Sequence, residues 1–199
     1  MRNPLASPWQ QKWFAMEVTH PKVQEMASAL QALGFRWFRN AAHDGPSTVV
    51  LRGESGCGKT HCAKRLLRWC QSVAVTACSQ GHYPTRAPSA MYAEWGGVVD
   101  GFKEGCYEIM DDLCGVDMLV LDDLGSEHDP SRNALSKLCH VLTRREGLWT
   151  VITTNIKATD WGRRWDMRVA DRLLRHSKVI DLAGTPTYSA WSPQDTLTP

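Results

Sequence analysis

The feature that most constrains the fold of this chain is a glycine-rich segment with the spacing GxxxxGKT, which runs from Gly53 to Thr60. Glycines in such a loop permit backbone conformations that aim successive N–H groups at phosphate oxygens. The helix that follows adds the positive end of its dipole. The lysine can reach the β- and γ-phosphates of a nucleotide, and the threonine hydroxyl can bind Mg²⁺. The segment therefore predicts a phosphate-binding loop between a buried strand and a helix.

The residues on either side of the loop supply that context. The four residues Thr48–Leu51 form a short apolar run typical of a strand, and Thr60 to about Gln71 has a helical pattern. We predict that ATP and Mg²⁺ bind here. The expected nucleotide-binding residues are those of the loop and the residue after it, namely Gly53, Glu54, Ser55, Gly56, Cys57, Gly58, Lys59, Thr60 and His61.

Further along the chain, apolar runs typical of strands alternate with helical patterns. An earlier helix is expected from Pro21, with Gly34 as its end. The other predicted strands are residues 89–93, 117–122, 149–154 and 178–182, and the predicted helices are residues 98–102, 104–113, 132–145 and 168–175. This alternation predicts an α/β fold, in which a parallel sheet is covered on both faces and binds its ligand at the carboxyl ends of the strands.

Two adjacent carboxylates, Asp122 and Asp123, stand where a buried strand ends. Asp122 can hold Mg²⁺, usually through water, and Asp123 can polarise an attacking water as a general base. A kinase that only transfers a phosphoryl group does not need the second acid, whereas a hydrolase does. Asn155 closes the next buried strand, and it would face the γ-phosphate if that strand lies between the other two. We therefore predict Lys59, Asp123 and Asn155 as catalytic residues, and Thr60 and Asp122 as metal ligands.

Two arginines, Arg168 and Arg172, stand four residues apart and hence on one face of a predicted helix. An arginine supplied by a neighbouring subunit can neutralise the charge that develops at the γ-phosphate. The alternative is a surface ion-pair ladder with Asp166 and Asp171. The spacing alone leaves both interpretations open.

The composition, with 43% hydrophobic and 22% charged residues in 199, is typical of one soluble globular domain. No apolar run approaches the roughly 18 residues that cross a bilayer, and the first residues have no apolar export signal. We therefore expect a cytoplasmic protein with no membrane contact. The seven cysteines form no CxxC pair, which indicates reduced thiols and neither disulfides nor a zinc site.

The charges are distributed unevenly along the chain, although the net charge is only +2. From Ala93 to Asp129 there are eleven acidic residues and one lysine, and from Ser131 to Lys178 there are eleven basic and four acidic residues. This asymmetry suits an acidic side that handles metal and a basic side that faces phosphates or a neighbour's acidic surface. The alternative is that most of these residues are solvated on helix faces.

Taken together, four segments resemble the DnaC/IstB branch of the AAA+ ATPases, and the resemblance covers roughly residues 20–188. These segments are Gly53–Thr60, Leu121–Gly125, Val151–Asn155 and Arg168–Leu173, and Ile180–Tyr188 is similar to the family's final strand and turn. The resemblance implies a P-loop NTPase of the AAA+ (ASCE) type, a three-layer sandwich without a C-terminal lid domain. It implies that Lys59 and Thr60 belong to Walker A, Asp122 and Asp123 to Walker B, and Asn155 to sensor 1. It makes Arg172 the arginine finger that acts on a neighbouring subunit, with Arg168 as a second candidate.

The resemblance also divides the chain into three segments. Residues 21–184 are expected to form the ATPase domain, and residues 185–199 a loose C-terminal tail. Residues 1–20 contain Trp9, Trp13 and Phe14. They are expected either to bind a partner or to pack on the core.

The function that the resemblance implies is an ATP-dependent helicase loader in DNA replication, with slow, switch-like hydrolysis. Its expected partners are a DnaB-type replicative helicase, single-stranded DNA and further copies of the chain, which associate through Arg172. Its compactness is typical of a phage or mobile-element protein. Lys103 and Arg132 are candidate DNA contacts. The alternatives are an IstB-like transposition helper that binds duplex DNA and recruits a transposase, a small-molecule P-loop kinase, and a regulatory protein that binds ATP but barely hydrolyses it.

Overall fold

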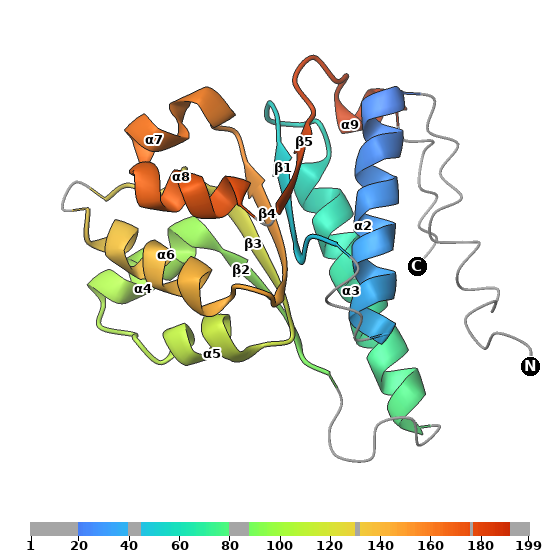
Figure 1. Cartoon of the computed structure of the whole chain (residues 1–199), viewed down its shortest axis with the longest axis horizontal. Helices are drawn as coiled ribbons and strands as arrows, with labels where there is room; N and C mark the ends of the chain where they lie inside the picture. Colours follow the sequence, from blue (N-terminus) through green and yellow to red (C-terminus); the bar gives the residue numbers. More distant parts are fainter. Residues whose placement is uncertain (1–19, 40–44, 80–87, 130–131, 176, 192–199) are drawn as a thin grey trace, which may run out of the picture.

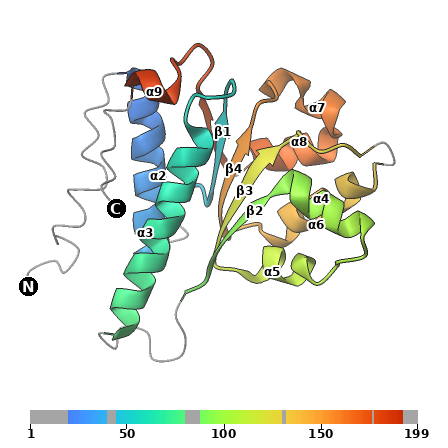
Figure 2. The same ribbon diagram turned by 180° about the vertical axis from the view of Figure 1, so that it is seen from behind.

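The fold is a five-stranded parallel sheet with helices on both faces (Figures 1 and 2). The computed structural model describes residues 20–39, 45–79, 88–129, 132–175 and 177–191. The strands are β1 (Thr48–Arg52), β2 (Ala90–Glu94), β3 (Met118–Leu124), β4 (Trp149–Thr154) and β5 (Ser177–Asp181). The helices are α2 (Pro21–Arg39), α3 (Lys59–Ser79), α4 (Trp95–Lys103), α5 (Ile109–Gly115), α6 (Asn133–Arg144), α7 (Trp161–Arg164), α8 (Met167–Leu174) and α9 (Tyr188–Trp191), with a 3₁₀ turn, η2, at Ala158–Asp160.

The strand order, β2-β3-β4-β1-β5, confirms the predicted parallel α/β fold. Because β4 lies between β1 and β3, the residues that follow these three strands meet at one edge of the sheet. This is the arrangement that the prediction for Asn155 required.

Alternation along the strands divides the interior into two cores. Side chains such as Val49, Leu51 and Val151 pack on α2 and α3. The intervening Val50 and Ile152 point to the opposite face and pack on the group that includes α4, α6 and α8. Both faces of the sheet are therefore buried, which explains why its central strands are continuous apolar runs.

The end predicted for the first helix at Gly34 is wrong, because α2 continues to Arg39. A Cβ atom at Gly34 would lie 2.9 Å from both Leu66 Cδ1 and the Trp69 ring. The glycine therefore serves the close approach of α2 to α3, although glycine inside a helix is itself destabilising.

The segment after β4 contains η2 and α7, which the sequence did not predict. The two turns are short, and buried Trp161 and Trp165 hold them against the second core. Helix α8 begins at Asp166, whose carboxylate accepts a hydrogen bond from the Val169 N–H at 2.9 Å. This hydrogen bond holds the pKa of the Asp166 carboxyl below its usual range.

The loose tail predicted for residues 185–199 is wrong for residues 185–191. Thr185 is buried, and the N–H of Tyr188, the first residue of α9, donates to the Gly56 carbonyl at 2.7 Å. These contacts fix the segment against the phosphate loop. Residues 192–199 lie outside the described residues, as do the aromatic residues Trp9, Trp13 and Phe14.

Two further expectations concern the cysteines and the membrane. The six cysteines whose side chains the structure describes, Cys57, Cys62, Cys70, Cys106, Cys114 and Cys139, are free thiols. Burial raises the pKa of the Cys62 thiol to about 12, which makes that thiol inert. No helix in the described part of the chain is long and apolar enough to span a bilayer.

Candidate nucleotide-binding and catalytic site

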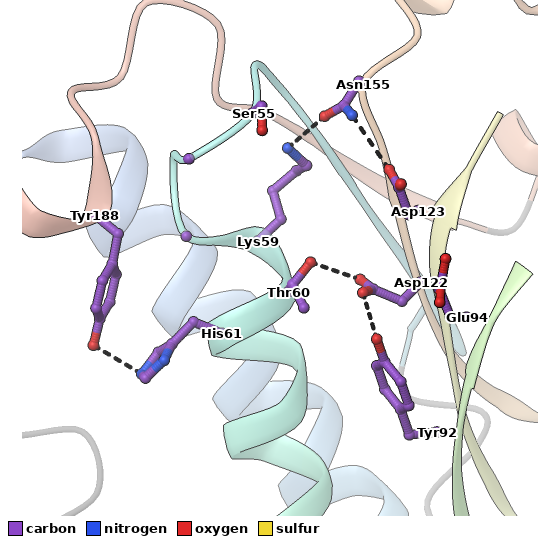
Figure 3. Close-up of a pocket in the computed structure, with 12 residues that line it drawn as sticks. Ser55, Lys59, Thr60, His61, Tyr92, Glu94, Asp122, Asp123, Asn155 and Tyr188 are labelled. Atoms are coloured by element: carbon purple, nitrogen blue, oxygen red, sulfur yellow. Dashed lines mark hydrogen bonds between the residues drawn. The ribbon is translucent and has the colours of Figure 1, made fainter. Parts of the chain in front are cut away.

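A pocket of about 400 Å³ opens at the carboxyl edge of the sheet, between the phosphate loop and the ends of β2, β3 and β4 (Figure 3). The predicted site residues among those lining it are Ser55, Gly56, Gly58, Lys59, Thr60, His61, Asp122, Asp123 and Asn155. Gly53 and Cys57 are buried loop residues that do not line the pocket. A Cβ atom at Gly53 would come within 2.8 Å of the Leu182 Cβ atom. Most of the residues predicted from the sequence therefore converge on one cavity.

The ammonium group of Lys59 is held at the base of this pocket. Its Nζ donates to the carbonyl oxygens of Gly53 and Glu54 at 2.9 and 2.8 Å, and to Asn155 Oδ1 at 2.8 Å. The residue is only 6% exposed. Three oxygens that carry no full charge orient the ammonium without neutralising it, so its charge remains available to a phosphate.

Asp122 is the most heavily hydrogen-bonded acid of the site and is 3% exposed. Its Oδ1 accepts from the hydroxyls of Thr60 at 2.9 Å and Thr153 at 2.6 Å. Its Oδ2 accepts from the Tyr92 hydroxyl at 2.7 Å. The carboxylate is therefore fixed in direction before any ligand binds.

Burial raises the pKa of the Tyr92 phenol, and the hydrogen bond to Asp122 raises it further. The phenol therefore stays protonated at neutral pH and remains a donor to the carboxylate. Lys64 Nζ lies 4.2 Å from the centroid of the Tyr92 ring and holds the ring from the side of α3.

The oxygens of Thr60 and Asp122 are the kind of ligand that Mg²⁺ prefers. Within the described residues, no group of three or more His, Cys, Asp or Glu side chains could hold a metal ion. This fits Mg²⁺, which is commonly held by one or two protein oxygens together with phosphates and water. The residues present thus suit a magnesium ion that enters with a nucleotide.

Asp123 is aimed into the pocket by an irregularity in β3. The register of β3 on β4 shifts between Leu121 and Leu124, and Asp123 has a left-handed φ of 54°. Aspartate tolerates this conformation better than most residues, and a bulge re-aims the side chain that it carries. Asn155 Nδ2 donates to Asp123 Oδ1 at 3.2 Å (Figure 3). Asn155 thus contacts both the lysine and the second acid.

His61 and Tyr188 close the opposite end of the pocket. The Tyr188 hydroxyl lies 2.8 Å from His61 Nε2, and the two ring centroids are 4.3 Å apart. Tyr188 was not predicted as a site residue, because the segment before it has no periodicity that places its ring in the pocket. Three further residues were missed as well. Tyr92 and Glu94 lie on β2, and Thr153 lies inside a buried strand.

Arg172 does not line the pocket of its own chain. Its Nη1 donates to the Arg168 carbonyl at 3.1 Å, and its Nε is buried without a hydrogen-bond partner. It borders a separate small cavity with Arg145 and Arg175. Arg168 is exposed and pairs with Asp166 at 3.0 Å. Any action of either arginine on a phosphate therefore requires a second subunit.

The comparisons with known proteins agree with this geometry. The sequence profile of the family described as IstB-like ATP binding protein matches residues 17–189. No curated protein sequence matches the chain.

Among solved structures, the DnaC helicase loader is similar, with a TM-score of 0.59 and 18% identity over 87% of this chain and 97% of that chain. The structure of DnaI is similar with a TM-score of 0.58 and 18% sequence identity, and the alignment covers 86% of this chain and 93% of that chain. AMPPCP-bound DnaA from Aquifex aeolicus is similar with a TM-score of 0.58 and 15% sequence identity, and the alignment covers 84% of this chain and 49% of that chain. At these identities the structural likeness establishes the fold alone.

Proposed function

Because the chain belongs to the family of IstB-like ATP-binding proteins, which are AAA+ ATPases, we propose that it is an ATP-dependent helicase loader. In this role it binds ATP at a boundary between subunits and delivers a DnaB-type replicative helicase to DNA. Hydrolysis then loosens the assembly, so that a difference in binding between the ATP and ADP states drives the cycle. Slow turnover suffices for such a switch.

The observation that carries the proposal is the meeting of Lys59, Asp123 and Asn155 in one pocket, on a fold similar to that of the DnaC helicase loader. The alignment covers 97% of the solved DnaC chain and 93% of the solved DnaI chain. The second acid, Asp123, contacts Asn155 beside the lysine of the loop. A small-molecule kinase has no need of this acid, which favours hydrolysis over phosphoryl transfer to a metabolite.

Five residues of the pocket have a proposed role in hydrolysis. Lys59 binds the β- and γ-phosphates and stabilises the charge that develops on them. Asp123 accepts a proton from the attacking water, and Asn155 orients that water. Thr60 and Asp122 hold Mg²⁺, which supplies charge neutralisation at the phosphate oxygens when bound.

Arg172 is proposed to complete the site of a neighbouring subunit. A guanidinium group suits the spread charge of the γ-phosphate better than an ammonium group does, because its donors form a planar fork. Arg168, one turn earlier on α8, is the second candidate. Self-association through this helix follows from the role.

A second function, that of a transposition helper, is favoured by the family profile, which carries the name of IstB and covers residues 17–189. Such a protein binds duplex DNA and recruits a transposase with the same ATPase residues. The nucleotide pocket therefore does not separate the two functions.

The molar mass of the complexes, measured by light scattering, distinguishes the two functions. The chain is mixed with the replicative helicase of its own host, in the presence of ATP and Mg²⁺, and in a parallel run with duplex DNA. We expect a stable joint complex with the helicase that the Lys59→Ala variant does not form. ATP-dependent assembly on duplex DNA, with no helicase complex, would contradict helicase loading and support the transposition helper.

A further inference from the structure

A second hollow, of about 450 Å³, lies beside the nucleotide pocket and shares Asn155 with it. It is bordered by the end of β4, by η2 and α7, and by the start of α6. Four of its lining residues are cations and one is an acid, namely Arg132, Lys157, Arg163, Arg164 and Asp160. We call these five residues together with Asn155 the basic hollow.

Two of the cations are balanced by acids of the same chain. Arg163 pairs with Asp160 at 3.1 Å. Arg164 Nη2 donates to Glu127 Oε1 at 3.2 Å and to the carbonyl oxygens of Gly125 and Glu127. Both guanidinium groups are therefore already paired with an acid of the same chain.

The other two cations, Arg132 and Lys157, are exposed and have no balancing acid. Neither side chain makes a hydrogen bond or ion pair with any residue that the structure describes. The basic hollow therefore presents two unneutralised positive charges toward whatever enters it.

The lining also indicates the class of ligand. Besides the six residues of the basic hollow, Ile156 is the lining residue that is apolar. Protein–protein interfaces have an apolar core, whereas interfaces with nucleic acids are polar and strongly positive. Arginine and lysine side chains supply most contacts to phosphate oxygens. Taking DNA as the partner from the proposed function, we propose that the basic hollow binds the sugar–phosphate backbone of single-stranded DNA.

The position of the hollow links this DNA to the nucleotide. Lys157 follows Asn155 by two residues, and the loop between them is held at both ends. The Ile156 N–H donates to Thr154 Oγ1 at 3.1 Å, and the Ile156 carbonyl accepts from Trp161 Nε1 at 3.0 Å. A backbone phosphate bound by Lys157 therefore acts on the same short loop that positions the Asn155 amide against Lys59 and Asp123. DNA in the hollow thereby changes the rate of ATP hydrolysis.

The test uses the double variant Arg132→Ala/Lys157→Ala and a fluorescein-labelled oligo(dT), with anisotropy recorded over a series of salt concentrations. Loss of two phosphate contacts is expected to reduce the slope of log K against log salt by about 1.4, and to weaken binding about tenfold at low salt. The wild-type chain shows a DNA-dependent change in ATP turnover, and the variant does not.

Lys103→Ala is the matched control. Lys103 was the other candidate DNA contact in the sequence and is also an exposed cation, but it lies on α4 and pairs with Asp100 at 2.7 Å, outside the hollow. Its DNA binding should equal that of the wild type. Affinity for ATP should be unchanged in all variants, which shows that the fold is intact.

Two results would overturn the proposal. The first is wild-type affinity and salt slope in the double variant. The second is normal DNA binding together with loss of the helicase complex, which would make the hollow a docking site for an acidic protein surface. DNA binding and helicase binding are measured separately, so a chain that never binds the helicase can still confirm the hollow.

Discussion

The nucleotide pocket and the basic hollow meet at Asn155, yet their side chains are arranged in opposite ways. In the pocket, Lys59 and Asp122 are almost fully buried, and each has three hydrogen-bond partners within the chain at 2.9 Å or less. In the hollow, Arg132 and Lys157 are exposed, and neither side chain makes a hydrogen bond or ion pair with the described residues. The acidic segment of the sequence thus supplies the carboxylates of the pocket, and the basic segment supplies the hollow.

The difference teaches where each function resides. A group held by its own chain is preorganised, and its substitution should be felt in the isolated subunit. An exposed cation without a partner in its own chain can act only on a ligand or another chain. Its substitution should therefore leave the activity of the isolated subunit unchanged until that partner is added. Arg172 is also expected to act only when a second subunit is present, although its guanidinium group is half-buried and donates to the Arg168 carbonyl of its own chain.

The largest effect is expected for Arg172, which should matter only when subunits associate. Arg172→Ala should lower ATP hydrolysis in the assembled state by about three orders of magnitude, because the guanidinium group that neutralises the transition state is lost. ATP binding should be intact. Turnover measured over a range of protein concentrations checks this, with Arg168→Ala as the comparison and the melting temperature as a control for folding. Wild-type turnover where subunits associate would rule Arg172 out.

Lys59→Ala tests the pocket itself. Removal of a charged donor that binds phosphate oxygens should reduce the affinity for ATP by about 100-fold, even in a monomer. Titration calorimetry measures this loss. Lys137→Ala, on α6 and outside the pocket, is the control and should bind ATP normally. Equal affinities in the two variants would break the assignment of the loop.

Tyr92→Phe removes a single hydroxyl from Asp122. With one oxygen of the buried carboxylate left unpaired, the metal ligand loses its fixed direction. The Mg²⁺ concentration for half-maximal hydrolysis should rise about tenfold. Because burial and Asp122 keep the phenol protonated, this effect should be the same across neutral pH. An unchanged magnesium requirement would show that Thr60 and Thr153 suffice to hold the acid.

Tyr188→Ala should have the smallest effect. The ring packs on His61 at the end of the pocket away from Asn155, and its loss should weaken ATP binding about fivefold. Binding of inorganic triphosphate should not change, since Lys59 and the loop remain. Tighter ATP binding in this variant would mean that the tyrosine obstructs the pocket.

Much of the pocket could be predicted from the sequence, because its chemistry is concentrated in short segments. The loop from Gly53 to Thr60 and the pair Asp122–Asp123 each follow an apolar strand, and parallel strands bring their carboxyl ends together. The prediction for Asn155 needed only the strand order, which the structure confirmed.

The remaining features depend on contacts between segments far apart in the chain. Gly34 resembles a helix end, and only the packing of α2 on Trp69 explains why the helix continues. Tyr188 reaches His61 across 127 positions, and neither residue carries a pattern that indicates the other. Lys157 and Arg132 are single cations in the sequence, and they gather into one hollow only because α6 and η2 flank the end of β4.

The central claim is that one chain binds ATP through Lys59 and prepares its hydrolysis through Asp123 and Asn155. Single-turnover hydrolysis by the Asp123→Asn variant, with ATP affinity measured on the same sample, tests it most directly. We predict that hydrolysis falls by about 100-fold or more, because the general base is lost, while ATP affinity stays at the wild-type value. Hydrolysis at the wild-type rate would contradict the assignment, and Asp123 would then be no more than a hydrogen-bond partner of Asn155.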